Sequence, residues 1–193
     1  MSSFSSSSPA PWYLNRSSIV SVDIRDGVTS IGSYAFQFLN ALTNVGIAAS
    51  VRWIGNSAFR DCSLLPSVAV PDGVIVLGAG AFSYCSSSTS ISFPSSLTSI
   101  GSSPFTGCYR LESLEVHPSN PRYESRDDVL FDKEKHSLVR CALAKAGNYS
   151  LPSDISSIGF SSFSGCRNLI SVFIPDTVTS IEGGAFDGCF GLK

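Results

Sequence analysis

The stretch IPDTVTSIEGGAFDGC, residues 174–189, decides the fold, because its layout returns at a fixed interval along the chain. The segment FPSSLTSIGSSPFTGC at 93–108 has the same layout. Phenylalanine stands near the end of each copy, at Phe36, Phe59, Phe82, Phe105, Phe163 and Phe186. Neighbouring phenylalanines are 23 residues apart except for one step of 58, which holds one unit of 23 and one of 35. The sequence is therefore an internal repeat in which one unit carries twelve extra residues.

Further apolar columns keep the same interval. An aliphatic residue lies five positions before each Phe, at Ile31, Ile54, Leu77, Ile100, Ile158 and Ile181. The third position after the Phe holds Leu39 and then Cys62, Cys85, Cys108, Cys166 and Cys189. Three positions further on come Leu42, Leu65, Ser88, Leu111, Leu169 and Leu192. An alternating pair such as Val68 and Val70 then follows, which is typical of a strand that buries one face.

These columns predict a repeat solenoid. A unit of this length cannot bury its own apolar face, so successive units must stack and pair as parallel strands. We expect leucine-rich repeats of 23 residues in about seven stacked turns, mostly β and irregular. Units begin near residues 19, 42, 65, 88, 111, 146 and 169 of a domain spanning 19–193, after a Ser- and Pro-rich flexible lead-in and start of a cap at 1–18.

Proline and glycine mark the bends of each unit. Proline closes the predicted strand in four units, at Pro71, Pro94, Pro152 and Pro175, where the missing N–H ends the strand ladder. Glycine follows the aliphatic column in most units. We expect that glycine to adopt a positive φ.

The long unit, within residues 111–145, is predicted to contain a β-hairpin insertion. VLF and SLV flank a charged turn, DKEKH at 132–136. A loop on a rigid scaffold often carries recognition, and this one is expected to gather Tyr123, Arg126, Phe131, Lys133 and Lys135 as candidate binding residues. The alternative is an insertion that is merely tolerated.

A second candidate surface follows from strand alternation. When alternate strand residues enter the core, the others face outward and form columns of their own. The first column is Ser21, Asn44, Ser67, Ser90, Ser113, Asn148 and Ser171, and the second includes Glu115 and Phe173. Such short hydrogen-bonding side chains cost little entropy to order against a partner. The alternative is that serine only keeps the strand face soluble.

The remaining reactive residues do not form a catalytic or metal-binding pattern. The cysteines follow the repeat step without a C-x-x-C motif, so we expect buried free thiols and no metal. Cys141 lies off the column and is expected to be the most exposed thiol, with a structural role equally open. His117 and His136 are expected to be solvated loop residues. No nucleophile, phosphate-binding or dinucleotide motif occurs, so neither an enzyme nor a cofactor is predicted.

Composition narrows the choice of partner. A formal net charge of −2 and the absence of basic runs argue against nucleic acid. The chain contains no apolar run of about 18 residues and no visible secretory signal. Asn15 and Asn148 begin N-x-S sequons and are possible glycosylation sites. The last unit stops at Leu192 and Lys193, which predicts either a piece of a longer array or end-to-end self-association.

The repeats resemble the BspA-like leucine-rich repeats. The phrases at 174–189 and 93–108 carry the resemblance, which covers residues 19–193, and the segment 120–141 looks like the hairpin insertion that recurs in that family. Two departures are the first two turns, which lack the closing proline, and Leu39 at the cysteine position. The resemblance implies a surface or extracellular protein of mucosal microbes that adheres to proteins or glycans, including extracellular matrix and other cells. The alternative is a cytoplasmic scaffold or effector.

Overall fold

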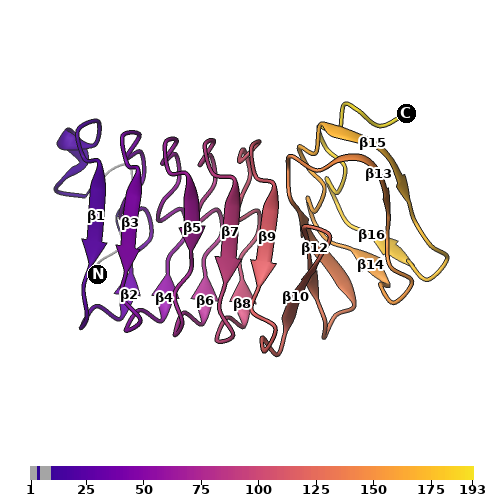
Figure 1. Cartoon of the computed structure of the whole chain (residues 1–193), viewed down its shortest axis with the longest axis horizontal. Coiled ribbons are helices and arrows are strands. Elements are labelled where there is room, and N and C mark those ends of the chain that lie inside the picture. Colours follow the sequence, from indigo (N-terminus) through magenta and orange to yellow (C-terminus); the bar gives the residue numbers. More distant parts are fainter. Residues whose placement is uncertain (1–3, 5–9) are drawn as a thin grey trace.

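A computed structural model describes residue 4 and residues 10–193. The turns stack along one axis, from the N-terminal to the C-terminal end of the chain (Figure 1). Each regular turn contributes one longer strand and one two-residue strand. The longer strands are β1 (Ser21–Ile24), β3 (Asn44–Ile47), β5 (Ser67–Ala69), β7 (Ser90–Phe93), β9 (Ser113–Val116), β13 (Ala146–Ser150) and β15 (Asn168–Phe173). The short strands are β2 (Ser30–Ile31), β4 (Trp53–Ile54), β6 (Val76–Leu77), β8 (Ser99–Ile100), β14 (Ser157–Ile158) and β16 (Ser180–Ile181).

Parallel pairing at the repeat interval confirms the predicted β-solenoid. The short strands of the first four turns form one sheet, in which Ile31 pairs with Ile54, Ile54 with Leu77, and Leu77 with Ile100. The longer strands form three separate parallel sheets, β1-β3, β5-β7-β9 and β13-β15. The only helical segment in the described part of the chain is a 3-10 turn, Tyr13–Asn15.

The phenylalanine column forms a stack in the interior. Ring centroids are 5.2 Å apart between Phe36 and Phe59 and 5.3 Å apart between Phe59 and Phe82. Trp12 extends the stack toward the N-terminus, 5.4 Å from Phe36, and its indole N–H donates to the carbonyl of Ala35. Phe4 packs edge-on against Trp12. The predicted flexibility of the lead-in concerns mainly residues 1–3 and 5–9, which lie outside the described residues.

Glycine is required after the aliphatic column for a different physical reason from the one predicted. The expectation of positive φ is wrong for Gly55, Gly78 and Gly101, which do not appear among the left-handed residues. A Cβ at Gly78 would instead lie 2.5 Å from the backbone nitrogen of Asn56, and one at Gly101 would lie 2.4 Å from that of Ala79. Successive turns approach too closely for a side chain here, so the constraint is contact between turns.

The insertion is a three-stranded meander rather than a single hairpin. The predicted hairpin is confirmed as β11 (Val129–Asp132) paired antiparallel with β12 (Ser137–Cys141). The additional strand β10 (Tyr123–Arg126) pairs with β11 across a two-residue turn, Asp127 and Asp128, at φ of 50° and 59°. Two successive positive φ values are typical of the type I′ turns that match strand twist. β12 then pairs in parallel with β14, which returns the chain to the solenoid.

Candidate interaction surface

The outward columns of the longer strands lie in register. Ser21 pairs with Asn44, Ser67 with Ser90, Ser90 with Ser113, and Asn148 with Ser171. All seven side chains are exposed or half-buried. We call these seven residues, with Glu115 and Phe173, the strand face. Its serines and asparagines present hydroxyl and amide groups with no net charge among them.

Hydrogen bonds between neighbouring turns organise parts of the strand face. The hydroxyl of Ser171 donates to Oδ1 of Asn148 at 2.8 Å, and Nδ2 of Asn44 lies 3.4 Å from the Ser21 hydroxyl. Within one turn, on β9, the Ser113 hydroxyl donates to the Glu115 carboxylate at 3.3 Å. These contacts limit the freedom of short side chains, so a partner would lose little further entropy by ordering them.

The C-terminal end of the strand face is apolar. Phe173 is 66% exposed at the C-terminal end of β15, and Ile170 in the same strand is also exposed. Exposed aromatic side chains are the usual anchors of interfaces because they bury a large area with few rotatable bonds. The strand face therefore combines a long polar portion with one exposed aromatic side chain.

Two interruptions divide the strand face. The sheets β1-β3 and β5-β7-β9 are separate, and Pro66 precedes β5 at the position where Thr43 and Thr89 donate backbone N–H groups to the preceding turn. Proline has no N–H to donate, so it weakens pairing there. The second interruption is the insertion, which separates β9 from β13 (Figure 1).

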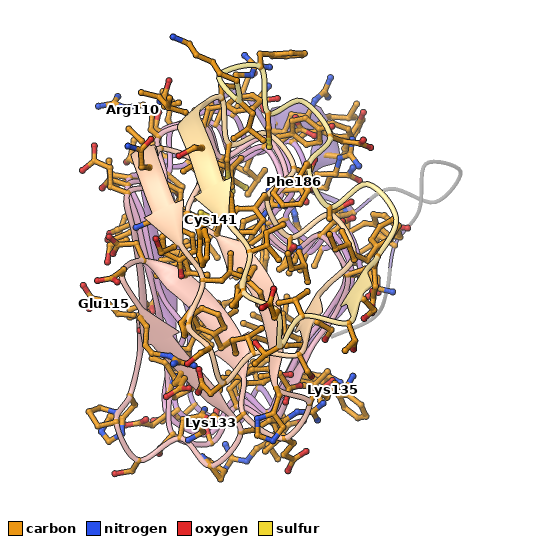
Figure 2. All side chains as sticks on the ribbon, turned by 90° about the vertical axis from the view of Figure 1, so that its right-hand side faces the viewer. Arg110, Glu115, Lys133, Lys135, Cys141 and Phe186 are labelled. Atoms are coloured by element: carbon orange, nitrogen blue, oxygen red, sulfur yellow. The ribbon has the colours of Figure 1, made fainter. Side chains whose placement is uncertain are left out.

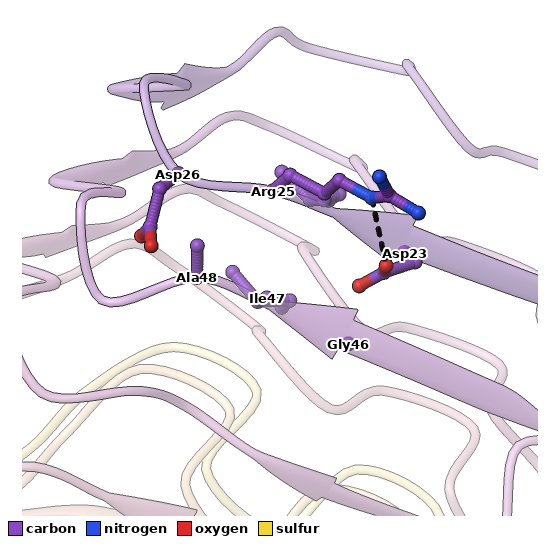
Figure 3. A pocket seen from close by; sticks show the side chains of 7 residues that line it. Asp23, Arg25, Asp26, Gly46, Ile47 and Ala48 are labelled. Carbon is purple, nitrogen blue, oxygen red and sulfur yellow. Dashed lines mark hydrogen bonds and ion pairs between the residues drawn. The ribbon is translucent and has the colours of Figure 1, made fainter.

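A shallow hollow of about 560 Å³ lies beside the N-terminal end of the strand face (Figure 3). It is lined by Asp23, Ile24, Arg25, Asp26, Gly46, Ile47 and Ala48. Arg25 lies 3.3 Å from the Asp23 carboxylate, and a Cβ at Gly46 would lie only 2.9 Å from that carboxylate. The charged groups of this hollow thus partly neutralise each other, and they offer polar contacts to a partner rather than a nucleophile with its base.

The insertion does not present all its predicted residues to solvent. Tyr123 and Phe131 are buried, so their assignment to an exposed binding loop is corrected: β10 and β11 pack these aromatic residues into the core. Arg126 covers the Phe131 ring at 4.6 Å and lies 3.0 Å from carboxylate oxygens of Glu124 and Asp154. The hydrogen bond from Arg126 lowers the pKa of Asp154. Lys133 donates to the Asn120 carbonyl.

Viewed along the solenoid axis, Figure 2 places Lys133, Lys135 and Glu115 at the periphery and Cys141 in the interior. Lys135 and Glu115 are exposed, whereas Lys133 is half-buried. Of the predicted insertion residues, Lys135 is therefore the one most accessible to a partner. Arg126 and Lys133 instead make ion pairs and hydrogen bonds to other residues of the fold.

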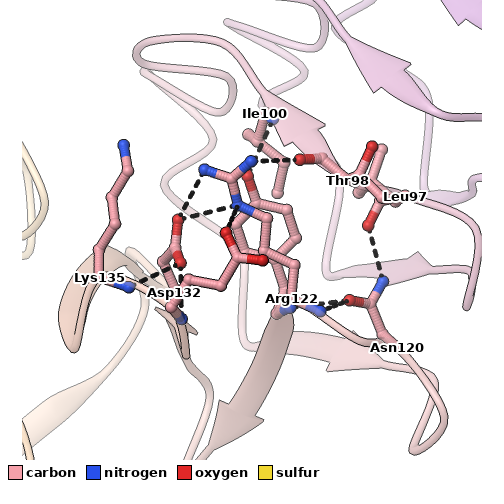
Figure 4. A network of polar contacts seen from close by, with 9 residues as sticks. Leu97, Thr98, Ile100, Asn120, Arg122, Asp132 and Lys135 are labelled. Atoms are coloured by element: carbon pink, nitrogen blue, oxygen red, sulfur yellow. Dashed lines mark hydrogen bonds and ion pairs between the residues drawn. The ribbon is translucent and has the colours of Figure 1, made fainter.

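A polar network fixes the base of the insertion to the preceding turn (Figure 4). Nε and Nη2 of Arg122 both lie 3.1 Å from Oδ2 of the buried Asp132, and Nη1 donates to the Thr98 carbonyl at 2.8 Å. Asn120 is also buried and donates to the carbonyls of Pro94 and Leu97. These bonds satisfy polar groups that burial would otherwise leave unpaired. The insertion is consequently a fixed part of the scaffold.

The cysteines are buried and free, as predicted for the column. The expectation that Cys141 would be the most exposed thiol is wrong, because β12 carries it into the core beside the next turn. The backbone N–H of Cys141 donates to Ser162, just as that of Phe59 donates to Ala81, so Cys141 takes a place in the phenylalanine column. His117 and His136 are exposed, as predicted.

Three further features concern metal binding, membrane-spanning helices and the two possible glycosylation sites. Within the described ranges, no group of three or more His, Cys, Asp and Glu residues could hold a metal ion. No helix of the described residues has the length and apolar character needed to cross a bilayer. Asn15 and Asn148 are both exposed, and Asn148 belongs to the strand face, so a glycan there would cover part of it.

Trp53 is an exposed aromatic residue that sequence reasoning missed. It lies on β4, where the corresponding residues of neighbouring strands are Ser30 and Val76, and it is 59% exposed. The signal was available, because Trp53 precedes the core residue Ile54 and alternation therefore turns it outward. It belongs to the short-strand sheet and not to the strand face.

These features define a leucine-rich-repeat solenoid, a class whose stacked repeats create extended binding surfaces. The chain belongs to the family described as the BspA type leucine-rich repeat region, with six copies matched over residues 11–126 and 140–193. None of the curated proteins matches the sequence.

Solved structures from bacteria share the fold. A leucine-rich repeat protein from Eubacterium ventriosum is 27% identical with a TM-score of 0.77, over 95% of this chain and 61% of that one. A leucine-rich cell surface protein from Faecalibacterium prausnitzii is 30% identical with a TM-score of 0.67, over 92% and 54%. The pneumococcal vaccine antigen PcpA is 21% identical with a TM-score of 0.63, over 92% and 48%, and shows the fold alone. The chain thus spans about half to three fifths of these proteins.

Proposed function

We propose that this chain is a non-catalytic binding module displayed at a cell surface, where it holds a protein or glycan partner and supports adhesion. The observation that carries the proposal is the strand face, an in-register array of short polar side chains that ends at the exposed Phe173. Family membership and the cell surface protein from Faecalibacterium prausnitzii support the surface location.

The strand face suits a large partner better than a small metabolite. Its hydroxyl and amide groups are spread along the solenoid, and they do not converge on one enclosed cavity. An extended partner can hydrogen-bond to several turns at once, with Phe173 contributing apolar contact area at one end. Extracellular matrix proteins and surface glycans have this extended form.

The alternative is an intracellular scaffold that uses the same face for a protein partner. Labelling of intact cells with an antibody against the protein, repeated after permeabilisation, separates the two. Signal on intact cells supports the surface proposal, and signal only after permeabilisation contradicts it and favours the scaffold.

Binding itself is tested with the purified protein on arrays of matrix proteins and of glycans. We expect saturable binding to a protein or glycan on these arrays. Failure to bind any member above the level of an unrelated solenoid would contradict the adhesion proposal. Mass analysis of native protein would also reveal whether Asn148 carries a glycan, which would leave less of the strand face open.

A further inference from the structure

The side chain of Arg140 is a buried cation without a carboxylate partner. It is 2% exposed, and its guanidinium donates to the carbonyls of Ser161 and Ser164, while Nε has no hydrogen-bond partner. Among residue 4 and residues 10–193, the ion pairs of the fold involve other cations. Buried charges are normally paired, so the acidic groups that surround this cation are important.

Those acidic groups are thiols. The thiols of Cys166, Cys141, Cys108 and Cys189 lie close enough to Arg140 to influence its pKa. Cys141 and Cys166 share one acceptor, since their Sγ atoms lie 3.4 Å and 3.8 Å from the carbonyl oxygen of Ala142. Each thiol also shifts the pKa of the other. They come from different turns, and among the described residues they are the only two thiols that approach the same carbonyl oxygen.

The environment distinguishes the two thiols. The hydrogen bond from Cys141 lowers the pKa of Cys166, burial opposes this change, and the charges of Arg140 and Lys145 add to it. The same thiol–thiol bond and burial raise the pKa of Cys141. The lowered pKa favours Cys166 as the nucleophile of the pair and Cys141 as the thiol that supplies a proton.

We propose that Cys141 and Cys166, which share the Ala142 carbonyl beside the buried Arg140, form a peroxide-sensitive dithiol whose oxidation closes a disulfide between the insertion and the following turn. The oxidant is hydrogen peroxide or a small organic hydroperoxide. This proposal is independent of what the strand face binds.

The chemistry balances without another reactant. The Cys166 thiolate attacks one peroxide oxygen, the O–O bond breaks, and a sulfenic acid and hydroxide form. The hydroxide takes the proton of Cys141 and becomes water. The Cys141 thiolate then attacks the Cys166 sulfur, the S–O bond breaks, and hydroxide leaves as the S–S bond forms. Two thiol sulfurs lose two electrons, and the peroxide gains them.

The other cysteines lack this arrangement. Cys62, Cys85 and Cys108 each donate to a main-chain carbonyl of the preceding turn. Burial raises the pKa of Cys62 and of Cys108 to about 12, which keeps them protonated and poor nucleophiles. Oxidation is thus expected at one pair only.

The test is peptide mapping of the folded protein after brief exposure to hydrogen peroxide. Remaining thiols are alkylated in denaturant, and trypsin then releases Cys141 in the peptide 141–145 and Cys166 in 146–167. We expect these two peptides joined, with the loss of two hydrogens, and the other four cysteines alkylated. Unjoined peptides, bridges spread over all six cysteines, or a sulfinic acid at Cys166 without a bridge would overturn the proposal.

Variants separate the roles of the residues. Cys166→Ser should abolish the bridge, whereas Cys189→Ser, a neighbouring column thiol, should leave it intact. Arg140→Met should slow bridge formation at neutral pH at least tenfold, and Arg140→Lys should restore part of the rate. Circular dichroism confirms that each variant is folded, and an unchanged rate in folded Arg140→Met would contradict the assigned role. If Arg140→Met does not fold, the comparison of wild type with Arg140→Lys decides, because equal rates would contradict the role of the guanidinium.

Discussion

The thiol of Cys108 donates a hydrogen bond to the carbonyl oxygen of Phe82, 3.1 Å away and 26 residues earlier in the chain. The same bond joins Cys85 to Phe59 at 3.3 Å and Cys189 to Phe163 at 3.1 Å. At Cys62, Cys85, Cys108 and Cys189 the cysteine column thus connects a turn to the phenylalanine of the turn before it. This contact gives a physical reason for a small residue that is both apolar and a weak donor at this position.

Replacing Cys108 should separate its packing from its hydrogen bond. Cys108→Ala removes both and is expected to cost about 1–3 kcal/mol of unfolding free energy, because a buried carbonyl loses one donor and a small void remains. Cys108→Ser keeps a donor and should cost less. Urea unfolding of both variants measures the difference, and a larger loss for serine than for alanine would show that the hydrogen bond contributes little.

The buried thiols predict a fall in stability at alkaline pH. Burial raises the pKa of Cys62 and of Cys108 from 9.0 to about 12, so the folded protein retains protons that the unfolded chain releases above pH 9. Their contribution is fully present below pH 9 and is lost as pH rises toward 12. The urea midpoint should drop between pH 8 and pH 10.5, and by less in a variant with serine at both positions. Equal drops would contradict the role of the thiols.

Glycine substitutions test the close approach of successive turns. Gly78→Ala should destabilise the fold by about 1–3 kcal/mol, because its Cβ would lie 2.5 Å from the backbone of the preceding turn. Gly183→Ala is the control, since a Cβ there meets only Phe160 at 3.6 Å. Alanine at Gly183 should be neutral or stabilise by about 0.4–1 kcal/mol through reduced freedom of the unfolded chain. Similar thermal midpoints for the two variants would exclude the steric explanation.

The network at the base of the insertion gives a further prediction. Asp132→Ala removes both bonds to the Arg122 guanidinium and those to the backbone N–H groups of Glu134 and Lys135. We expect a loss of about 1.5–3 kcal/mol, because the buried carboxylate accepts charge-assisted bonds. Glu134→Ala, which removes a long and exposed contact to the same arginine, should change stability by less than about 1 kcal/mol. Hydrogen exchange in β11 and β12 should rise only in the first variant.

The regular turns could be predicted because each column repeats. The interval of 23 residues fixed which residues stack, and the pairing of Ile54 with Leu77 and of Ser67 with Ser90 follows it. The outward position of the strand face follows from alternation within each strand. The repeat pattern does not predict which partner the strand face binds, because one fold can serve many functions.

The insertion could be predicted only in part because no repeat constrains it. VLF and SLV identified one hairpin, but the turn at Asp127 and Asp128 adds a third strand, and the meander folds Tyr123 and Phe131 inward. The point at which β12 rejoins the solenoid places Cys141 in the core. The close approach at Gly78 likewise depends on the separation of two turns, which one unit of sequence does not contain.

The measurement that tests the central claim most directly is binding by variants of the strand face, on the matrix protein or glycan that the wild-type protein binds. Ser67→Arg and Phe173→Ala alter the strand face, while Ser180→Arg and Trp53→Ala make matched changes on the short strands. We predict at least a tenfold loss of affinity for each strand-face variant and less than a twofold change for each control. Equal affinities across all four variants, or losses confined to Ser180→Arg and Trp53→Ala, would contradict the account.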